Sequence, residues 1–133
     1  MNAQDNSKRV QQMYAEFQKG NISAVLDNLT ADVEWKDAAK PPIPYAGTKH
    51  GIKEVGEYFK KLDQAQEFLT FEPKEFIAQD GTVVALGHLK ARIKSTNKTV
   101  ESDWTMTFHF KDGKVNEFRS CYDVDAALQA FRP

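Results

Sequence analysis

The sequence predicts an α+β fold, in which helices pack on one face of a curved antiparallel sheet. Three observations support this prediction. Apolar residues in the first half recur mostly at the spacing of a helical stripe, whereas the second half alternates and is rich in β-branched and aromatic residues. Gly87 interrupts one alternating stretch, and a glycine inside a strand often marks a bend. The length of 133 residues fits one domain, residues 1–133.

The helices are predicted from stripes of apolar residues. They cover residues 7–19, 21–29, 50–64 and 124–131. Ser7 is the expected cap of the first helix, and either Asn21 or Ser23 is the expected cap of the second. Between the second and third helices lies a strand, followed by a proline-rich loop of the long kind that often carries function.

The second half is predicted to form antiparallel strands joined by tight turns. These strands cover residues 68–79, 82–95, 100–110 and 115–123. Asp80-Gly81 and Asp112-Gly113 are strong two-residue hairpin signals, and Asn97-Lys98 is a weaker one.

The last hairpin turn predicts which residues share a face of the sheet. Asp112-Gly113 places Phe110 opposite Val115 and Met106 opposite Arg119. The resulting inner face carries Trp104, Met106, Phe108, Arg119, Cys121 and Asp123. The resulting outer face carries Thr105, Thr107, Phe118, Ser120 and Tyr122.

The turn at Asn97-Lys98 predicts the pairing of the two long central strands. It places Leu89 opposite Met106 and Gly87 opposite Phe108, so that the apolar residues of both strands share the inner face. On the outer face it pairs Arg92 with Asp103.

The inner face is mostly apolar but ends in two charged residues, which are costly in an apolar setting unless paired or hydrated. One interpretation is a pocket wall with Arg119 and Asp123 at its polar end. The other is that both lie in solvent at the sheet rim, with Asp123 as the cap of the last helix.

The first strand, predicted over residues 32–37, also ends in a carboxylate on its apolar face. Val33, Trp35 and Asp37 share that face because side chains alternate along a strand. Asp37 is either a base inside a pocket or a residue that ends the strand and caps the next turn. Tyr45, in the following loop, either closes over a cavity or packs on its rim.

Composition excludes several classes of function. The net charge of −1 and the lack of a basic run give no sign of nucleic-acid or membrane binding. The three histidines show no metal-ligand spacing and no glycine-rich phosphate loop is present, so neither a metal nor a cofactor is expected. The single cysteine, Cys121, is expected to be buried, and the polar N-terminus favours a cytoplasmic protein.

Three segments carry a family resemblance over nearly the whole chain: QMYAEFQKGNISAVLDNLTADVEW, AGTKHGIKEVGEYFKKL and DWTMTFHFKDGKVNEFRSCYD. They resemble the SnoaL-like, ketosteroid isomerase-like branch of the nuclear transport factor 2-like superfamily. This resemblance implies a conical, curved antiparallel sheet wrapped around three N-terminal helices, with a deep apolar pocket. It also implies a homodimer through the outer sheet face, which Phe118 and Tyr122 would suit.

The resemblance to ketosteroid isomerase assigns roles to individual positions. That enzyme pairs a carboxylate base with an oxyanion hole made of a tyrosine and a protonated aspartate. By ungapped counting, its base falls on Asp37, its tyrosine on Met13, next to Tyr14, and its protonated aspartate on Met106. Methionine cannot donate a hydrogen bond, so true steroid isomerase activity is not expected. Resemblance to SnoaL-type cyclases makes Asp123 a second candidate.

These considerations predict a small-molecule-binding protein, and an isomerase or cyclase acting on a carbonyl compound is one form of it. The candidate catalytic residues are Asp37, Asp123 and Tyr14. The candidate ligand contacts are Trp35, Tyr45, Trp104, Met106, Arg119, Phe17 and Phe59. The alternatives are a binding protein without chemistry and a protein-interaction module that uses the outer sheet face.

Overall fold

A computed structural model describes residues 2–133. Within this range the helices are α1 (Ala3–Gln18), α2 (Ile22–Leu26), α3 (Gly51–Ala65) and α4 (Val124–Phe131). The strands are β1 (Leu29–Lys36), β2 (Thr48–His50), β3 (Gln66–Gln79), β4 (Thr82–Ile93), β5 (Thr99–Lys111) and β6 (Lys114–Cys121). They form a six-stranded sheet in the order β2-β1-β6-β5-β4-β3.

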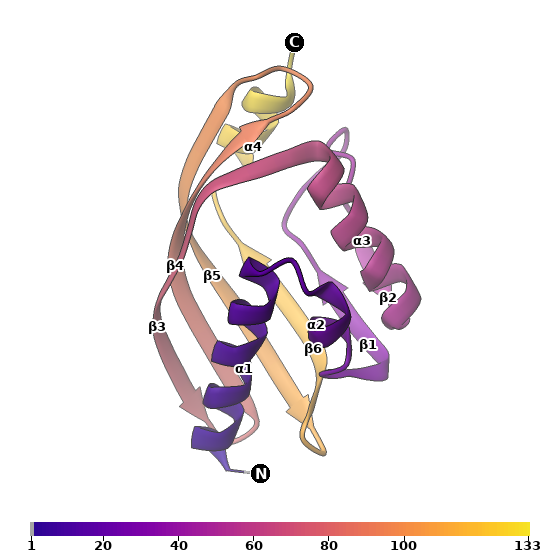
Figure 1. The fold of residues 1–133 in the computed structure, drawn as a ribbon, viewed down its shortest axis with the longest axis vertical. Coiled ribbons are helices and arrows are strands. Elements are labelled where there is room, and N and C mark those ends of the chain that lie inside the picture. The colour runs from indigo at the N-terminus through magenta and orange to yellow at the C-terminus, as the bar shows by residue number, and fades with distance from the viewer. Residues whose placement is uncertain (1) are drawn as a thin grey trace.

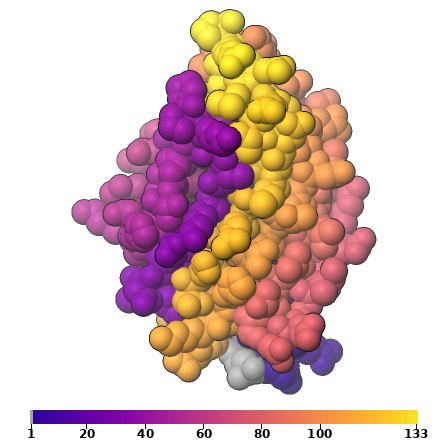
Figure 2. All heavy atoms as spheres, turned by 180° about the vertical axis from the view of Figure 1, so that it is seen from behind, coloured from indigo at the N-terminus to yellow at the C-terminus, as the bar shows by residue number. Residues whose placement is uncertain are grey.

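The predicted fold class is confirmed. Helices α1, α2 and α3 lie on one side of a curved sheet, and α4 lies near the far ends of β4 and β5 (Figure 1). The opposite face is formed mainly by the strands, with the C-terminal residues of α4 at one end of it (Figure 2). The sheet is mixed rather than wholly antiparallel, because β1 and β6 run parallel. None of the helices in the described range is long and apolar enough to cross a membrane.

The caps of the first two helices were predicted with mixed success. Helix α1 begins earlier than expected, because the Asn2 side chain accepts a hydrogen bond from the Asp5 backbone N–H at 2.8 Å. The predicted cap Ser7 therefore lies inside the helix. Helix α2 uses Asn21, whose side chain accepts from the Ala24 N–H at 3.4 Å.

Two of the three predicted hairpin turns are confirmed. Asp112 and Gly113 both have positive φ, 52° and 84°, as a type I′ turn requires. Asp80-Gly81 also joins its strands directly, because Gln79 pairs with Thr82. The turn predicted at Asn97-Lys98 is wrong, since β4 ends at Ile93 and residues 94–98 form a longer connection.

The longer connection changes the partners of β4 but not its faces. Leu89 pairs with Ser102 and Gly87 with Trp104, rather than with Met106 and Phe108. The register differs by an even number of residues, so the apolar residues still point inward. The predicted pair of Arg92 with Asp103 is wrong, and Asp103 instead contacts His88, with 2.8 Å between Oδ1 and Nδ1.

A β-bulge overturns the predicted faces of β6. Phe110 pairs with Val115 as expected, but the register then shifts, and Phe108 pairs with Phe118. Because a bulge inserts one residue into one strand, every later side chain changes face. The predictions that Arg119 and Cys121 point inward are therefore wrong, since both are exposed.

The same bulge places other β6 side chains in the interior. Phe118 and Ser120 are each 3% exposed, and Tyr122 lines the interior beyond the strand end. The prediction that these three residues lie on the outer face is therefore wrong. Phe118 and Tyr122 accordingly give no support to a dimer through that face.

Candidate functional site

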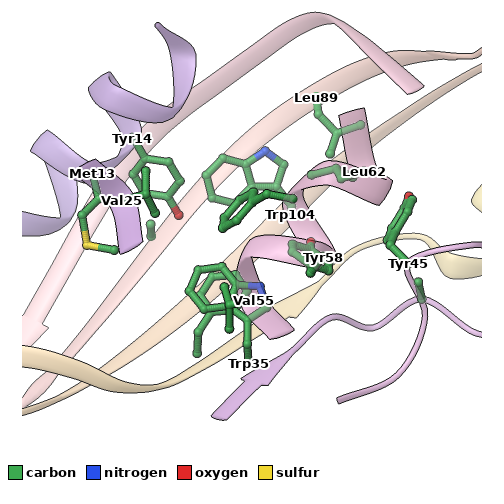
Figure 3. Close-up of a cluster of buried hydrophobic side chains, with 14 of the residues drawn as sticks. Met13, Tyr14, Val25, Trp35, Tyr45, Val55, Tyr58, Leu62, Leu89 and Trp104 are labelled. Atoms are coloured by element: carbon green, nitrogen blue, oxygen red, sulfur yellow. The ribbon is translucent and has the colours of Figure 1, made fainter. Parts of the chain in front are cut away.

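The helices and the concave face of the sheet line a partly open cavity of about 90 Å³. Its walls are mostly aromatic and aliphatic, and side chains from α1, β1 and α3 converge on it (Figure 3). Its lining comprises Met13, Tyr14, Phe17, Val25, Trp35, Asp37, Tyr45, Tyr58, Phe59, Leu62, Gln66, Phe68, Phe71, Leu89, Val100, Ser102, Met106, Phe108, Phe118, Ser120, Tyr122 and Ala127.

One carboxylate, that of Asp37, belongs to this lining. It directly follows β1 and accepts three hydrogen bonds. The Tyr58 hydroxyl donates to Oδ2 at 2.5 Å, and the Tyr122 hydroxyl donates to Oδ1 at 2.5 Å. The backbone N–H of Ala39 also donates to Oδ1, at 2.8 Å. Asp37 thus caps the turn after β1, as one interpretation predicted, and also lies in the cavity wall, where the other interpretation placed it.

The two carboxylate oxygens of Asp37 differ in their remaining capacity. A carboxylate offers about four lone-pair positions, two on each oxygen. Oδ1 accepts from both Tyr122 and Ala39, whereas Oδ2 accepts from Tyr58 alone. Oδ2 therefore retains an unused acceptor position.

The tyrosines around Asp37 stay protonated. Burial raises the pKa of Tyr58 well above its ordinary value, and the charge of Asp37 raises it further. The pKa of Tyr122 is raised by the same two causes, with burial the larger. Burial also raises the pKa of Tyr45, whose hydroxyl donates to Gln66 Oε1 at 2.7 Å. All three phenols therefore act as hydrogen-bond donors across the physiological pH range.

Tyr14 lies at another part of the cavity. Its hydroxyl donates to the Met106 sulfur at 3.1 Å, and burial raises its pKa well above the ordinary value. A thioether is a weak acceptor, so this hydroxyl is held loosely. Its ring packs among aromatic side chains, with centroids 5.6 Å from Trp104 and 5.8 Å from Phe108.

The structure brings together most, but not all, of the predicted site residues. Those that line the cavity are Asp37, Tyr14, Trp35, Tyr45, Met106, Phe17 and Phe59. Trp104 is buried but does not line the cavity; its ring stacks on that of Phe71, with centroids 5.1 Å apart. Arg119 lies on the outer face, 3.7 Å from the Glu117 carboxylate.

Asp123 also lies outside the cavity. It is exposed, and its side chain accepts a hydrogen bond from the Ala126 N–H at 3.0 Å, which makes it the cap of α4. The interpretation of Asp123 as a helix cap therefore accounts for its position, and the placement of Arg119 and Asp123 at a polar end of the pocket is not observed.

We predict that Asp123→Ala lowers the free energy of unfolding by about 0.5–2 kcal/mol, the usual cost of losing an N-cap. Ligand binding in the cavity should not change, because Asp123 does not contact it. Denaturant unfolding and ligand titration of Asp123→Ala and Asp123→Asn would measure both quantities. The asparagine variant keeps a capping oxygen and serves as the control. Weakened binding in both variants would contradict the purely structural role.

Sequence reasoning missed two contacts of Asp37. Tyr58 was assigned to the core because it belongs to the apolar stripe of α3, yet buried tyrosine hydroxyls usually find a partner. Tyr122 was assigned to the outer face, and only the bulge in β6 reverses it. An inward carboxylate at the end of β1 was the available signal that nearby hydroxyl donors were needed.

A groove of about 850 Å³ runs outside the cavity, between α1, α3 and β3. Six residues line both spaces: Phe17, Phe59, Leu62, Gln66, Phe68 and Phe71. The cavity is smaller than an engineered cavity of about 150 Å³ that holds one benzene molecule. A ring-sized ligand therefore requires wall residues to move. The partly exposed members of the shared wall, Phe17, Phe68 and Phe71, also border the groove, which offers space into which they can turn.

The described residues contain no cluster of side chains suited to a metal ion. Across residues 2–133, no three side chains among histidine, cysteine, aspartate and glutamate gather closely enough to hold an ion. The cavity lining likewise contains no lysine or arginine that would bind a phosphate-bearing cofactor.

Solved structures with the same architecture define the class of fold. A nuclear transport factor 2-like protein from Burkholderia xenovorans LB400 is 30% identical, with a TM-score of 0.89 and 99% of each chain covered. TerC, co-crystallised with polyporic acid, is 23% identical, with a TM-score of 0.84 over 95% of this chain and 97% of TerC. A candidate SnoaL-like polyketide cyclase from Mesorhizobium loti is 15% identical, with a TM-score of 0.72 over 86% and 97%.

The fold is therefore that of nuclear transport factor 2-like proteins. The family model of the SnoaL-like domain matches residues 10–118, and the chain belongs to that family. No curated protein matches the chain.

Proposed function

We propose that this protein is an isomerase or cyclase that transfers a proton on a small, largely apolar carbonyl compound, with Asp37 as the base. The observation that carries this proposal is the position of the Asp37 carboxylate in the wall of an aromatic cavity, with an unused acceptor position on Oδ2. A fixed carboxylate in such a place matches the requirement of a general base, which must reach the proton it removes.

The reaction begins when Oδ2 of Asp37 takes a proton from the carbon next to the carbonyl group. The electron pair of the broken C–H bond moves toward the carbonyl oxygen and forms an enolate. In an isomerase, the protonated Asp37 returns the proton to another carbon of the same conjugated system. In a cyclase, the enolate carbon attacks a second carbonyl group of the same molecule, and the alkoxide that results takes up the proton.

Tyr58 and Tyr122 are positioning residues in this proposal. Both donate to the carboxylate, from α3 and from the end of β6, and so hold it from two sides. A base held in one orientation avoids the reorganisation that a mobile side chain would require at each turnover. Their raised pKa values keep the two protons on the phenols, so that Asp37 is the group that accepts the substrate proton.

The neighbouring structures suggest ligands for a first test. A candidate polyketide cyclase and a protein co-crystallised with polyporic acid share the fold, although likeness at such low identity shows the fold alone. Cyclic aryl ketones and polyporic acid are therefore suitable probes of the cavity. The expected partner is a small apolar or carbonyl-containing molecule, admitted through the phenylalanine wall next to the groove.

The test is hydrogen exchange into small ketones. The native protein is incubated in deuterated buffer with a panel of cyclic aryl ketones, and NMR follows the loss of the proton next to the carbonyl group. We expect exchange faster than in buffer for at least one ketone that also changes tryptophan fluorescence. Tight binding of several ketones with exchange at the buffer rate would contradict the catalytic proposal.

The second candidate function is binding without chemistry, and one observation favours it. The Tyr14 hydroxyl meets the Met106 thioether, where the resemblance to ketosteroid isomerase would place a carboxylic acid. A ligand recovered unchanged after prolonged incubation would support this candidate. The homodimer implied by the family resemblance also stays a proposal, and sedimentation of the purified protein would test it.

A further inference from the structure

The indole N–H of Trp35 is a buried donor without an acceptor. Trp35 is 4% exposed and lines the cavity, and its Nε1 has no hydrogen-bond partner within residues 2–133. A buried donor left unpaired costs about 1–3 kcal/mol. An oxygen atom of a ligand would recover that cost if the ligand displaces the side chains that cover Nε1. The close-up shows the nitrogen edge of Trp35 on the side of Tyr58, where the Asp37 carboxylate is bound (Figure 3).

The other strong donors near Asp37 are already used within the protein. Tyr58 and Tyr122 donate to Asp37, and Tyr45 donates to Gln66. A ligand oxygen beside Asp37 therefore does not receive a hydrogen bond from these three phenols as they stand. Trp35 lies two residues before Asp37 in the sequence, and both line the same cavity, so one small substrate can contact both.

Packing fixes the Trp35 ring. It stacks on Phe118 at a centroid distance of 3.8 Å and an interplanar angle of 16°, and meets Phe59 edge-on at 5.5 Å. A donor whose direction is fixed before the substrate arrives stabilises developing charge without reorganisation. The ring is thus held in the manner expected of an oxyanion donor.

We propose that the Trp35 Nε1–H donates a hydrogen bond to the carbonyl oxygen of the substrate, and more strongly to the enolate oxygen. This inference rests on the proposed function for the identity of the substrate. It defines the substrate class more closely: a ketone whose oxygen lies toward Trp35 while the adjacent C–H lies at Asp37 Oδ2. The charge that Asp37 generates by removing a proton then develops at an atom that already faces a donor.

The test compares a ketone with its deoxygenated counterpart. The probes are 1-indanone and indane, which differ by the carbonyl group, and calorimetry measures the affinity of each. The native protein should prefer 1-indanone, and Trp35→Phe should reduce that preference about tenfold, as expected for one lost hydrogen bond. Trp104→Phe is the matched control, because Trp104 also has an unpaired Nε1 but does not line the cavity.

A second measurement uses the native protein and does not depend on the folding of a variant. The chain contains two tryptophans, so its indole N–H groups give two NMR signals. The Trp35 signal should move when 1-indanone is added and should move far less with indane. The Trp104 signal, assigned from Trp104→Phe, should be the less affected of the two by the carbonyl group.

The outcomes separate this inference from the proposed function. Equal preference for 1-indanone in native protein and Trp35→Phe, or no binding of either probe to the native protein, would overturn the role of Trp35. A preference that depends on Trp35 without any proton exchange would support the donor and count against catalysis. Exchange that depends on Asp37, together with an unchanged preference of Trp35→Phe for the ketone, would support catalysis and count against the donor.

Discussion

Asp37→Asn is expected to reduce proton exchange on an accepted ketone by about 10²–10⁴-fold, the usual contribution of a general base. Asparagine has nearly the same shape but carries no charge and cannot take up a proton at neutral pH. Its oxygen can still accept from Tyr122 and from the Ala39 N–H, so that the turn after β1 should persist. The measurement is the NMR exchange rate of native and variant protein at equal ligand saturation.

Asp37→Asn should increase the affinity for an anionic ligand, although it decreases proton exchange. An aryl phenolate resembles an enolate, and the negative charge of Asp37 opposes it in a cavity with mostly apolar walls. Asp37→Asn removes that repulsion, so the variant should bind 1-naphtholate more tightly than the native protein does. Fluorescence titration above the pKa of the phenol would measure the difference. Weaker binding in the variant would contradict the placement of the Asp37 charge beside the bound anion.

Asp123→Asn is the matched control for the Asp37 variant. It removes the other carboxylate that the sequence suggested as a base, but this carboxylate caps α4 and does not line the cavity. We expect its exchange rate to equal that of the native protein. If Asp123→Asn lost proton exchange while Asp37→Asn kept full activity, Asp123 would be the base, and the proposed site would be wrong.

Gly87→Ala is expected to destabilise the fold by about 3 kcal/mol or more, at or beyond the upper end of the usual cost of overpacking. A methyl group at this position would overlap the Trp104 ring and the backbone carbonyl oxygen of Glu72. The Trp104 ring is closely packed, and the carbonyl belongs to the neighbouring strand β3, so neither can move aside cheaply. Denaturant unfolding followed by tryptophan fluorescence would measure the loss.

Gly56→Ala is the control for this prediction. Gly56 lies inside α3, and an added methyl group would make only ordinary contact, 3.5 Å from the Leu26 Cδ1 atom. Because glycine is a poor helix former, this variant should be more stable by about 0.5–1 kcal/mol. A Gly87→Ala protein as stable as the native protein would show that β3 and β4 are not held as closely as the structure indicates.

Local sequence patterns were sufficient for the four helices and the five longer strands of residues 2–133 and for the curvature of the sheet, but not for the three-residue strand β2, which was not predicted. Asp112-Gly113 specifies a type I′ turn because both residues tolerate positive φ, and that turn occurs. Alternation in β4 placed its apolar residues on the inner face even though its predicted partners were wrong. Alternation in β1 likewise placed Asp37 on the same side as Trp35, and both line the cavity.

Local patterns failed to predict the register of β6 against its neighbouring strands. The bulge in β6 accompanies the pairing of this strand with β5 on one side and β1 on the other. No residue type in VNEFRSCYD marks the bulge. The bulge nevertheless places Phe118 and Tyr122 on the inner side and leaves Arg119 on the outer side. A single inserted residue has this effect because side chains alternate with a period of two.

The sequence by itself determined the fold class, two of the hairpin turns and the inward position of the Asp37 carboxylate, because each depends on residues close together in the chain. Tertiary structure decided what surrounds that carboxylate. The Tyr58 hydroxyl comes from 21 residues away and the Tyr122 hydroxyl from 85 residues away. Such contacts depend on how α3 and β6 pack, and alternation within one strand carries no information about the residues that another element brings to it.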